Sequence, residues 1–316
     1  MASTGLSPAR QFGTLIGLFV LCGVLWALTP HFLTVSNLLN VAQQTSINAI
    51  VAVGMTFVIL SGGIDLSVGS IVAVSGVVLG MLLQQGLPAP VAIGAGLATG
   101  MGVGLVNGLF VSRGGLPPFI VTLGMMSVAR GAALVLTEGR PVSGFDPGFR
   151  GLATGEVGVV PAPVALTVLV YVAAYVVLTQ TTFGRYVYAI GGNEEATRLS
   201  GVPVQRHKTL VYGVSGLTSA AAAVVLTARL DSAQPIAGMM YELDAIAATV
   251  IGGTSLMGGE GTVAGTLVGA LIMGVLRNGL NLLGVSSFLQ QIVIGAVIIG
   301  AVLVDTLMKR QWRFRL

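Results

Sequence analysis

Charged residues are scarce in this sequence. They make up 8% of its 316 residues, whereas hydrophobic residues make up 54% and the mean hydropathy is +0.93. Soluble domains carry about 25% charged residues, so a soluble globular domain is excluded and an integral membrane protein is indicated. The net charge of +4 does not indicate a nucleic-acid partner, because the basic residues gather in short connectors and near the C-terminus. In a membrane protein that distribution is an orientation signal.

Residues and motifs for enzymatic chemistry are missing as well. With one cysteine, Cys22, and two histidines, His31 and His207, the chain can form neither an intrachain disulfide nor a Cys/His metal site. The sequence has no GxxxxGKS/T loop for ATP, no HExxH motif and no GxSxG elbow. We therefore predict that the chain is not an enzyme, holds no metal or cofactor, and does not bind ATP in the manner of a P-loop protein.

Apolar runs of membrane-spanning length recur along the whole chain. About 20 helical residues are needed to cross about 30 Å of hydrocarbon. We predict an all-α fold, a polytopic transmembrane bundle that forms one domain over residues 1–316, with a polar connector at His31–Ser46. The ten predicted spans are Phe12–Leu28, Ile47–Leu60, Leu66–Leu83, Ala89–Ser112, Phe119–Leu136, Ala162–Thr179, Thr209–Ala228, Ala245–Met257, Thr262–Leu283 and Ser287–Leu307. Ile47–Leu60 and Ala245–Met257 are too short, which indicates broken or partly buried helices.

Ten spans place both termini on one side of the membrane, and the basic residues indicate which side. Cytoplasmic connectors of membrane proteins carry an excess of Lys and Arg. On the face of the termini, the ten basic residues are Arg10, Arg113, Arg185, Arg198, Arg206, Lys208, Lys309, Arg310, Arg313 and Arg315. The other face carries Arg140, Arg150 and Arg229. Both termini are therefore predicted to be cytoplasmic.

Glycine follows two patterns along the chain. Every fourth residue over Gly96–Gly108 and over Gly261–Gly269 is glycine, and small residues at this spacing give a helix a smooth face for close packing. The pattern GGxxLxxG occurs at Gly62–Gly69 and again at Gly252–Gly259, in each case after a short span. This second pattern predicts two similar helix breaks.

The longest strongly charged stretch between apolar segments is Phe183–Lys208. Its middle predicts a short helix with both ends marked. Asn193 suits the N-cap, and Glu194 and Glu195 favour the first turn, while Gly201 can adopt the left-handed conformation that ends a helix. Because so short a helix is not stable alone in water, it needs a surface to lie on. A contact for a soluble partner and a solvated loop between helices are both open interpretations.

Asp65 is the only charged residue between Arg10 and Arg113. Ionisable groups inside a membrane are costly and mark pathways or partners, so Asp65 could line a translocation pathway. It could also cap a helix that begins at Leu66, by accepting the free N–H groups there, and the two roles are compatible. The predicted pathway candidates are Asn48, Asp65, Ser67, Asn107 and Asn278. For the asparagines, hydrogen bonding between helices is the alternative role.

Three further polar features each allow two interpretations. Arg130 and Arg277 fall inside apolar spans, where each could either snorkel or pair with a buried acid. Glu242 and Asp244 lie at the entry to a span. Thr137–Pro163, the longest segment on the second face, is rich in glycine and proline, and it could either contact something outside or form an irregular loop.

Four segments together resemble the ribose-type permeases of bacterial ABC sugar importers. They are Asn37–Val74, which contains ILSGGIDLSVGS, Thr182–Val202, which contains AIGGNEEATRLSG, Ala228–Gly261, and Asn278–Ser287. The resemblance implies a permease of the bacterial inner membrane that forms a homodimer, with the translocation pathway between the two copies. It further implies a dimer of cytoplasmic ABC ATPase subunits, a periplasmic or lipid-anchored sugar-binding protein, and ribose or a related monosaccharide as the transported solute.

The coupling segment of that family falls on the predicted short helix. The resemblance thus assigns contact with the ATPase to Gly192, Asn193, Glu194, Glu195, Arg198 and Gly201. The alternative class is an ion-coupled secondary transporter of a small polar solute. Such a transporter would normally show several membrane-embedded acids or histidines, and Asp65 alone supports it.

Overall fold

The chain forms an α-helical bundle. The structure is a computed structural model that describes residues 8–313, with the side chains of residues 13–300, 302 and 303. Its helices are α1 (Pro8–Leu28), α2 (Val35–Leu60), α3 (Val68–Gln84), α4 (Ala89–Ser112), α5 (Pro118–Thr137), α6 (Pro147–Thr154), α7 (Ala162–Gln180), α8 (Thr182–Gly192), α9 (Glu194–Leu199), α10 (Val204–Leu230), α11 (Tyr241–Ile251), α12 (Val263–Leu282) and α13 (Ser287–Arg313). Two antiparallel pairs of very short strands are β1 (Val142–Ser143) with β4 (Ser232–Ala233), and β2 (Glu156–Val157) with β3 (Val160–Pro161).

Within the described residues, six helices are long and apolar enough to cross a membrane: α2, α4, α5, α7, α10 and α12. Shorter apolar helical stretches lie at Gly13–Leu28, Val68–Gln84 and Ser287–Gly300. The prediction of a polytopic helical membrane protein is therefore confirmed. The count of ten spans and the cytoplasmic location of the termini stay predictions. Part of the charge count behind that location falls outside the described side chains, namely Arg10, Lys309, Arg310, Arg313 and Arg315.

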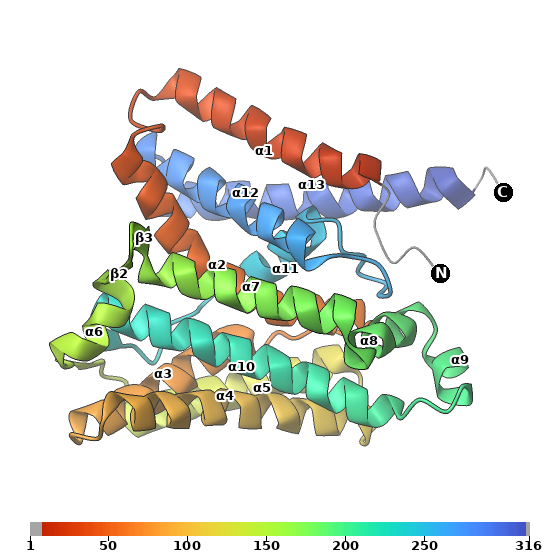
Figure 1. The fold of residues 1–316 in the computed structure, drawn as a ribbon, viewed down its shortest axis with the longest axis horizontal. Coiled ribbons are helices and arrows are strands. Elements are labelled where there is room, and N and C mark those ends of the chain that lie inside the picture. The colour runs from red at the N-terminus through yellow and green to blue at the C-terminus, as the bar shows by residue number, and fades with distance from the viewer. Residues whose placement is uncertain (1–7, 314–316) are drawn as a thin grey trace.

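The bundle has two ends that differ in structure (Figure 1). Helices α8 and α9 lie at one end, and the start of α1 and the end of α13 point toward the same end. Helix α6 and the β2–β3 pair lie at the opposite end. We call these the α9 end and the α6 end. The short helices α6, α8 and α9 and the β2–β3 pair thus lie at the two ends of the bundle, where a partner protein could contact them.

Helix α2 is longer than the sequence predicted. It runs without a break from Val35 to Leu60, and the Thr34 side chain at its N-cap accepts a hydrogen bond from the Asn37 N–H at 3.3 Å. The polar connector predicted at His31–Ser46 is therefore wrong over most of its length. One of its polar side chains has a partner inside the bundle: the amides of Asn37 and Asn278 bond reciprocally at 3.0 and 2.8 Å.

The glycine face over Gly96–Gly108 packs closely, as predicted. Helix α4 lies against α10 so tightly that a Cβ added at Gly100 would come within 2.6 Å of both Ala220 Cβ and the Gly216 carbonyl oxygen. On α12, Gly265 and Gly269 pack against the backbone of α11 and of the residues that follow it. Gly261 does not belong to that helical face. It lies before α12 with φ +149°.

Candidate functional site

The short helix predicted in the charged stretch is present as α9, with both predicted end signals in place. The Asn193 side chain accepts a hydrogen bond from the Ala196 N–H at 2.9 Å. At the other end Gly201 has φ +83°, its N–H donates to the Arg198 carbonyl at 3.0 Å, and the Val202 N–H donates to the Thr197 carbonyl at 3.4 Å. This pair of bonds is the Schellman arrangement that closes a helix C-terminus.

The charges of α9 are paired with one another or with α10. Glu195 bonds Arg198 at 2.6 and 2.5 Å through its two oxygens, and Glu194 bonds Lys208 at 2.9 Å. The Glu195 carboxylate raises the pKa of the Arg198 guanidinium through this hydrogen bond and its charge. Exposed pairs of this kind contribute at most about 1 kcal/mol, so they do not by themselves order the helix. Leu199 is 79% exposed beside them. Helix α9 therefore presents charged groups and an apolar side chain together at the surface.

Most of the rest of Phe183–Lys208 is also helical. Helix α8 begins after Thr181, whose hydroxyl accepts a hydrogen bond from the Gly184 N–H at 3.2 Å. Val187 and Ile190 are buried, and the Tyr188 hydroxyl donates to the Gly261 carbonyl at 2.8 Å. The sequence pattern does not predict α8, and it predicts the next span from Thr209, whereas α10 begins at Val204. The two interpretations of this stretch, a contact for a soluble partner and a solvated connector, both stay predictions.

Four glycines connect α9 to two helix breaks. The predicted breaks are confirmed: residues 61–67 separate α2 from α3, and residues 252–262 separate α11 from α12. The Gly259 N–H donates to the Leu60 carbonyl at 2.9 Å. A Cβ at Gly258 would come within 2.9 Å of both Gly191 Cα and the Gly62 nitrogen. We call Gly62, Gly191, Gly258 and Gly259 the glycine junction. It joins both breaks to the end of α8, two residues before α9.

Asp65 lies at the centre of a buried polar network and is fully shielded from solvent. Its Oδ1 accepts hydrogen bonds from the Ser67 N–H at 2.9 Å and the Ser67 hydroxyl at 2.6 Å. Its Oδ2 accepts from the Ser215 hydroxyl at 2.8 Å, and Asn107 Nδ2 donates to the Ser67 hydroxyl at 2.8 Å. Three of the predicted pathway candidates, Asp65, Ser67 and Asn107, thus meet in one place. In the part of the chain that the structure describes, no basic side chain forms an ion pair with Asp65.

The capping prediction for Asp65 is wrong in its detail. Helix α3 begins at Val68 and not at Leu66, and its N-cap residue is Ser67. The carboxylate still accepts a backbone N–H at the start of α3, but that N–H belongs to Ser67 itself. Asp65 therefore holds the turn that leads into the helix and does not cap its first turn.

A second polar cluster surrounds Asp244 on α11. Asp244 is 4% exposed. Its Oδ2 accepts from Arg277 Nη2 at 2.7 Å and from Asn48 Nδ2 at 3.1 Å. Of the two interpretations left open for Arg277, the structure shows the pair with a buried acid. These side chains border a cavity between α2, α11 and α12, which is also lined by Gln44, Thr45 and Met273. We call this cavity the Asp244 pocket. The sequence predicts Asp244 at the entry to a span but does not connect it with Asn48 or Arg277.

Asn278 and Arg130 have partners outside these two clusters. Asn278 pairs with Asn37 and lies in neither cluster. Arg130 does not snorkel freely, and among the described residues it forms no ion pair with an acid. Its Nη1 donates to the carbonyls of Pro235 and Ala237 at 2.8 and 2.6 Å. Backbone groups of a non-helical segment must find partners inside a membrane protein. Arg130 supplies that partner for the segment between α10 and α11.

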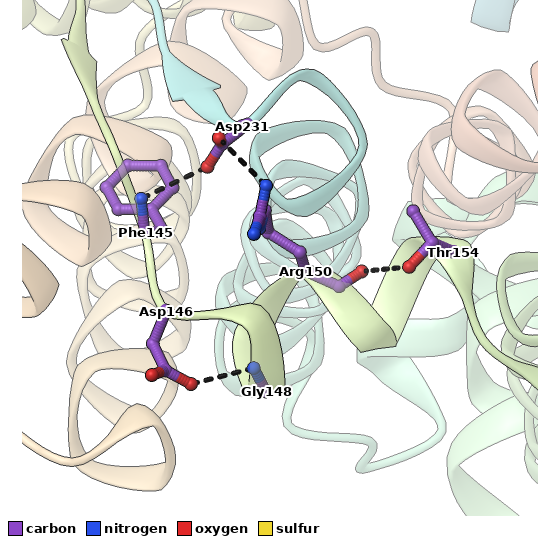
Figure 2. A network of polar contacts seen from close by, with 6 residues as sticks. All are labelled: Phe145, Asp146, Gly148, Arg150, Thr154 and Asp231. Atoms are coloured by element: carbon purple, nitrogen blue, oxygen red, sulfur yellow. Dashed lines mark hydrogen bonds and ion pairs between the residues drawn. The ribbon is translucent and has the colours of Figure 1, made fainter.

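The α6 end is ordered rather than an irregular loop. Figure 2 shows the Asp231 carboxylate, at the end of α10, between Phe145 and Arg150 of the segment Thr137–Pro163. It accepts from the Phe145 N–H at 3.1 Å and pairs with Arg150 at 3.5 Å. Asp146 caps α6 by accepting from the Gly148 N–H at 2.7 Å. These bonds, together with the β1–β4 pair, tie Thr137–Pro163 to the end of α10. Among the described residues, no group of three or more His, Cys, Asp or Glu side chains gathers to hold a metal ion.

Comparisons with known proteins agree on one family. The family model described as branched-chain amino acid transport system / permease component matches residues 37–302. The ribose import permease protein RbsC of Escherichia coli (strain K12) is 52% identical over 296 residues, which cover 92% of this chain and 92% of that protein. RbsC of Bacillus subtilis (strain 168) is 49% identical over 298 residues, covering 94% of this chain and 92% of that protein.

More distant relatives carry the names of other sugars. The D-allose transport system permease protein AlsC of Escherichia coli (strain K12) is 38% identical over 302 residues, covering 95% of this chain and 93% of that protein. The L-arabinose transport system permease protein AraH of the same strain is 38% identical over 298 residues, covering 93% of this chain and 90% of that protein. No solved structure matches the chain.

Proposed function

The chain belongs to the family of branched-chain amino acid transport system permease components, and on that basis we propose that it is the membrane permease of an ATP-driven importer for ribose or a related monosaccharide. The observation that carries this proposal is the identity of 52% and 49% to two ribose import permeases over at least 92% of each chain. The chain supplies no bond chemistry. Its task is to pass sugar through the membrane while a separate subunit hydrolyses ATP.

Helix α9 is the proposed contact for the ATPase subunits. The residues assigned to it are Gly192, Asn193, Glu194, Glu195, Arg198 and Gly201. Its exposed charges and its exposed Leu199 suit a protein interface, because charged groups select and steer a partner while an apolar side chain adds affinity. A helix this short gains most of its order from the surface that it contacts.

The glycine junction is the proposed route from α9 into the membrane. Closure of two ATPase subunits on ATP would displace α9 and the end of α8, and Gly191 lies directly against the two helix breaks. The permease then changes between inward- and outward-facing states. Coupling can be no larger than the difference in affinity of ATPase and sugar-binding protein for those two states.

The proposed pathway residues are Asn48, Asp65, Ser67, Asn107 and Asn278. We place the α9 end and both termini in the cytoplasm of a bacterial cell, and the α6 end outside, where a periplasmic or lipid-anchored sugar-binding protein docks. The hydrogen bonds of Figure 2 support a pre-formed docking surface there, since they fix α6 to the end of α10. A second copy of the permease completes the pathway.

One observation favours the alternative class, an ion-coupled secondary transporter. Asp65 is a buried carboxylate that, within the described chain, has only hydroxyl and amide partners, and proton- or sodium-coupled transporters use such groups. The two classes differ in their energy source. Uptake that follows a proton or sodium gradient without ATP would support the alternative.

The experiment combines assembly with transport. The permease is co-expressed with a candidate ATPase and a sugar-binding protein and analysed by native mass spectrometry, then reconstituted in proteoliposomes. We expect two permease copies with two ATPase subunits, no ATP bound to the permease alone, and uptake of D-ribose, D-allose or L-arabinose that requires both ATP and the binding protein. A permease monomer that transports fully without an ATPase would refute the proposal.

A further inference from the structure

The Asp244 pocket contains an ion pair between a buried acid, Asp244, and a partly exposed base, Arg277. A buried ion pair seldom stabilises a protein more than well-packed apolar residues of the same size, and charges inside a membrane are costly and mark functional sites. Asp244 and Arg277 come from α11 and α12, and Asn48 from α2. Three helices therefore place charged and polar groups around one cavity.

Two polar atoms at the pocket have no partner within the described chain. Thr45 Oγ1 and Asn48 Oδ1 are shielded from solvent yet form no hydrogen bond, and the Thr45 residue is only 4% exposed. Both residues line the cavity. Gly274 leaves room for the threonine side chain, because a Cβ there would overlap it. Buried polar atoms are normally bonded, so these two call for a partner that enters the pocket.

The groups around the cavity define the chemistry of that partner. Arg277 offers N–H donors, Asp244 and Asn48 Oδ1 offer acceptors, and the Thr45 hydroxyl can do either. The Asp244 and Arg277 charges cancel, so neither a cation nor an anion is favoured over a neutral group. A sugar hydroxyl is neutral and both donates and accepts. The cavity volume is about 30 Å³, room for about two water-sized groups, so hydroxyl groups fit where a whole monosaccharide does not.

We propose that the Asp244 pocket binds one or two hydroxyl groups of the sugar as it crosses the permease, with Thr45, Asn48, Asp244 and Arg277 as the binding residues. This inference rests on the proposed function of the chain as a sugar permease. The Arg277 side chain is 41% exposed, which gives the pocket an opening from the outside of the chain. The site lowers the barrier for a polyol that must leave water, because the pocket replaces hydrogen bonds that the hydroxyl groups make to water.

Thr45→Val tests the pocket, since it removes the hydroxyl and keeps the shape of the side chain. In the reconstituted importer with saturating D-ribose and its binding protein, we expect the amount of sugar moved per ATP hydrolysed to fall about threefold to tenfold, the effect of one lost hydrogen bond. The control is Ser75→Ala, which also removes a buried hydroxyl without a partner in the described chain but lies on α3 outside the pocket. A purely structural role predicts the opposite result for Thr45→Val, namely unchanged uptake and higher thermal stability.

A second measurement covers the case in which Thr45→Val does not fold. Because Cys22 is the only cysteine, Thr45→Cys in a Cys22→Ala background gives a single thiol at the pocket. We expect D-ribose, supplied with binding protein and ATP, to slow modification of this thiol by a water-soluble reagent. The inference is overturned, and the proposed function left intact, if D-ribose does not slow modification of the thiol and Thr45→Val moves as much sugar per ATP hydrolysed as the wild type. If the wild type shows no ATP-dependent uptake of D-ribose, D-allose or L-arabinose, the proposed function itself is wrong.

Discussion

Gly201→Val should uncouple transport by unwinding the end of α9. Gly201 has φ +83°, and a Cβ there would meet no atom within 4 Å, so the cost is one of backbone conformation alone. A left-handed residue other than glycine costs about 1–2 kcal/mol, and a β-branched one lies toward the high end. Against this, α9 has an N-cap that contributes about 1 kcal/mol and exposed ion pairs that contribute at most about 1 kcal/mol. The ratio of formed to unformed α9 should therefore fall about fivefold to thirtyfold.

The rest of the bundle should not respond, because within α9 only Thr197 is buried. The assays are binding-protein-stimulated ATP hydrolysis and D-ribose uptake in proteoliposomes, with thermal stability in detergent measured in parallel. Gly115→Val is the matched control, since Gly115 also has a positive φ, +64°, with no atom within 4 Å, but lies between α4 and α5. The reasoning is refuted if Gly201→Val keeps wild-type coupling, or if Gly115→Val loses as much.

Three other variants test other parts of the structure. Glu194→Lys/Glu195→Lys should leave membrane insertion and dimerisation intact but weaken co-purification with the ATPase or separate hydrolysis from uptake; unchanged co-purification and coupling would reduce α9 to a surface helix. Asp65→Leu should cost about 1–3 kcal/mol of stability, because three donors lose their acceptor, whereas Asp65→Asn keeps an acceptor oxygen and should transport almost normally. Loss of uptake in a stable Asp65→Asn protein would show that the charge is required. Gly104→Val should lower the melting temperature, because its side chain meets the backbone of α10, whereas Gly102→Val on the same helix meets nothing within 4 Å; equal melting of the two would contradict the packing.

Features determined by neighbouring residues could be predicted from the sequence. The ends of α9 follow from Asn193 and Gly201, which act on backbone groups within four residues. The glycine face of α4 follows from spacing on one helix. The two helix breaks follow from a repeated local pattern. In each of these cases the physical cause lies within a short stretch of chain.

Features that depend on distant partners could not be predicted. The first turns of α2 look like a polar connector until Asn37 meets Asn278, 241 residues away. The Asp244 pocket exists because α2, α11 and α12 converge, and no local pattern connects Asn48 with Asp244 across 196 residues. For Arg277 the sequence limited the options to two, and the fold selected the buried acid.

The glycine junction has a mechanical consequence. Side chains at an interface can change rotamer and absorb a small displacement, but Gly62, Gly191, Gly258 and Gly259 meet through backbone atoms alone. Such a contact has no side-chain torsions. A shift at Gly191 therefore acts directly on the backbone of both broken segments. How far a displacement at the α9 end extends into the membrane-spanning part then depends on the stiffness of the peptide units. A methyl group added at Gly191 or Gly258 would hold the two segments apart.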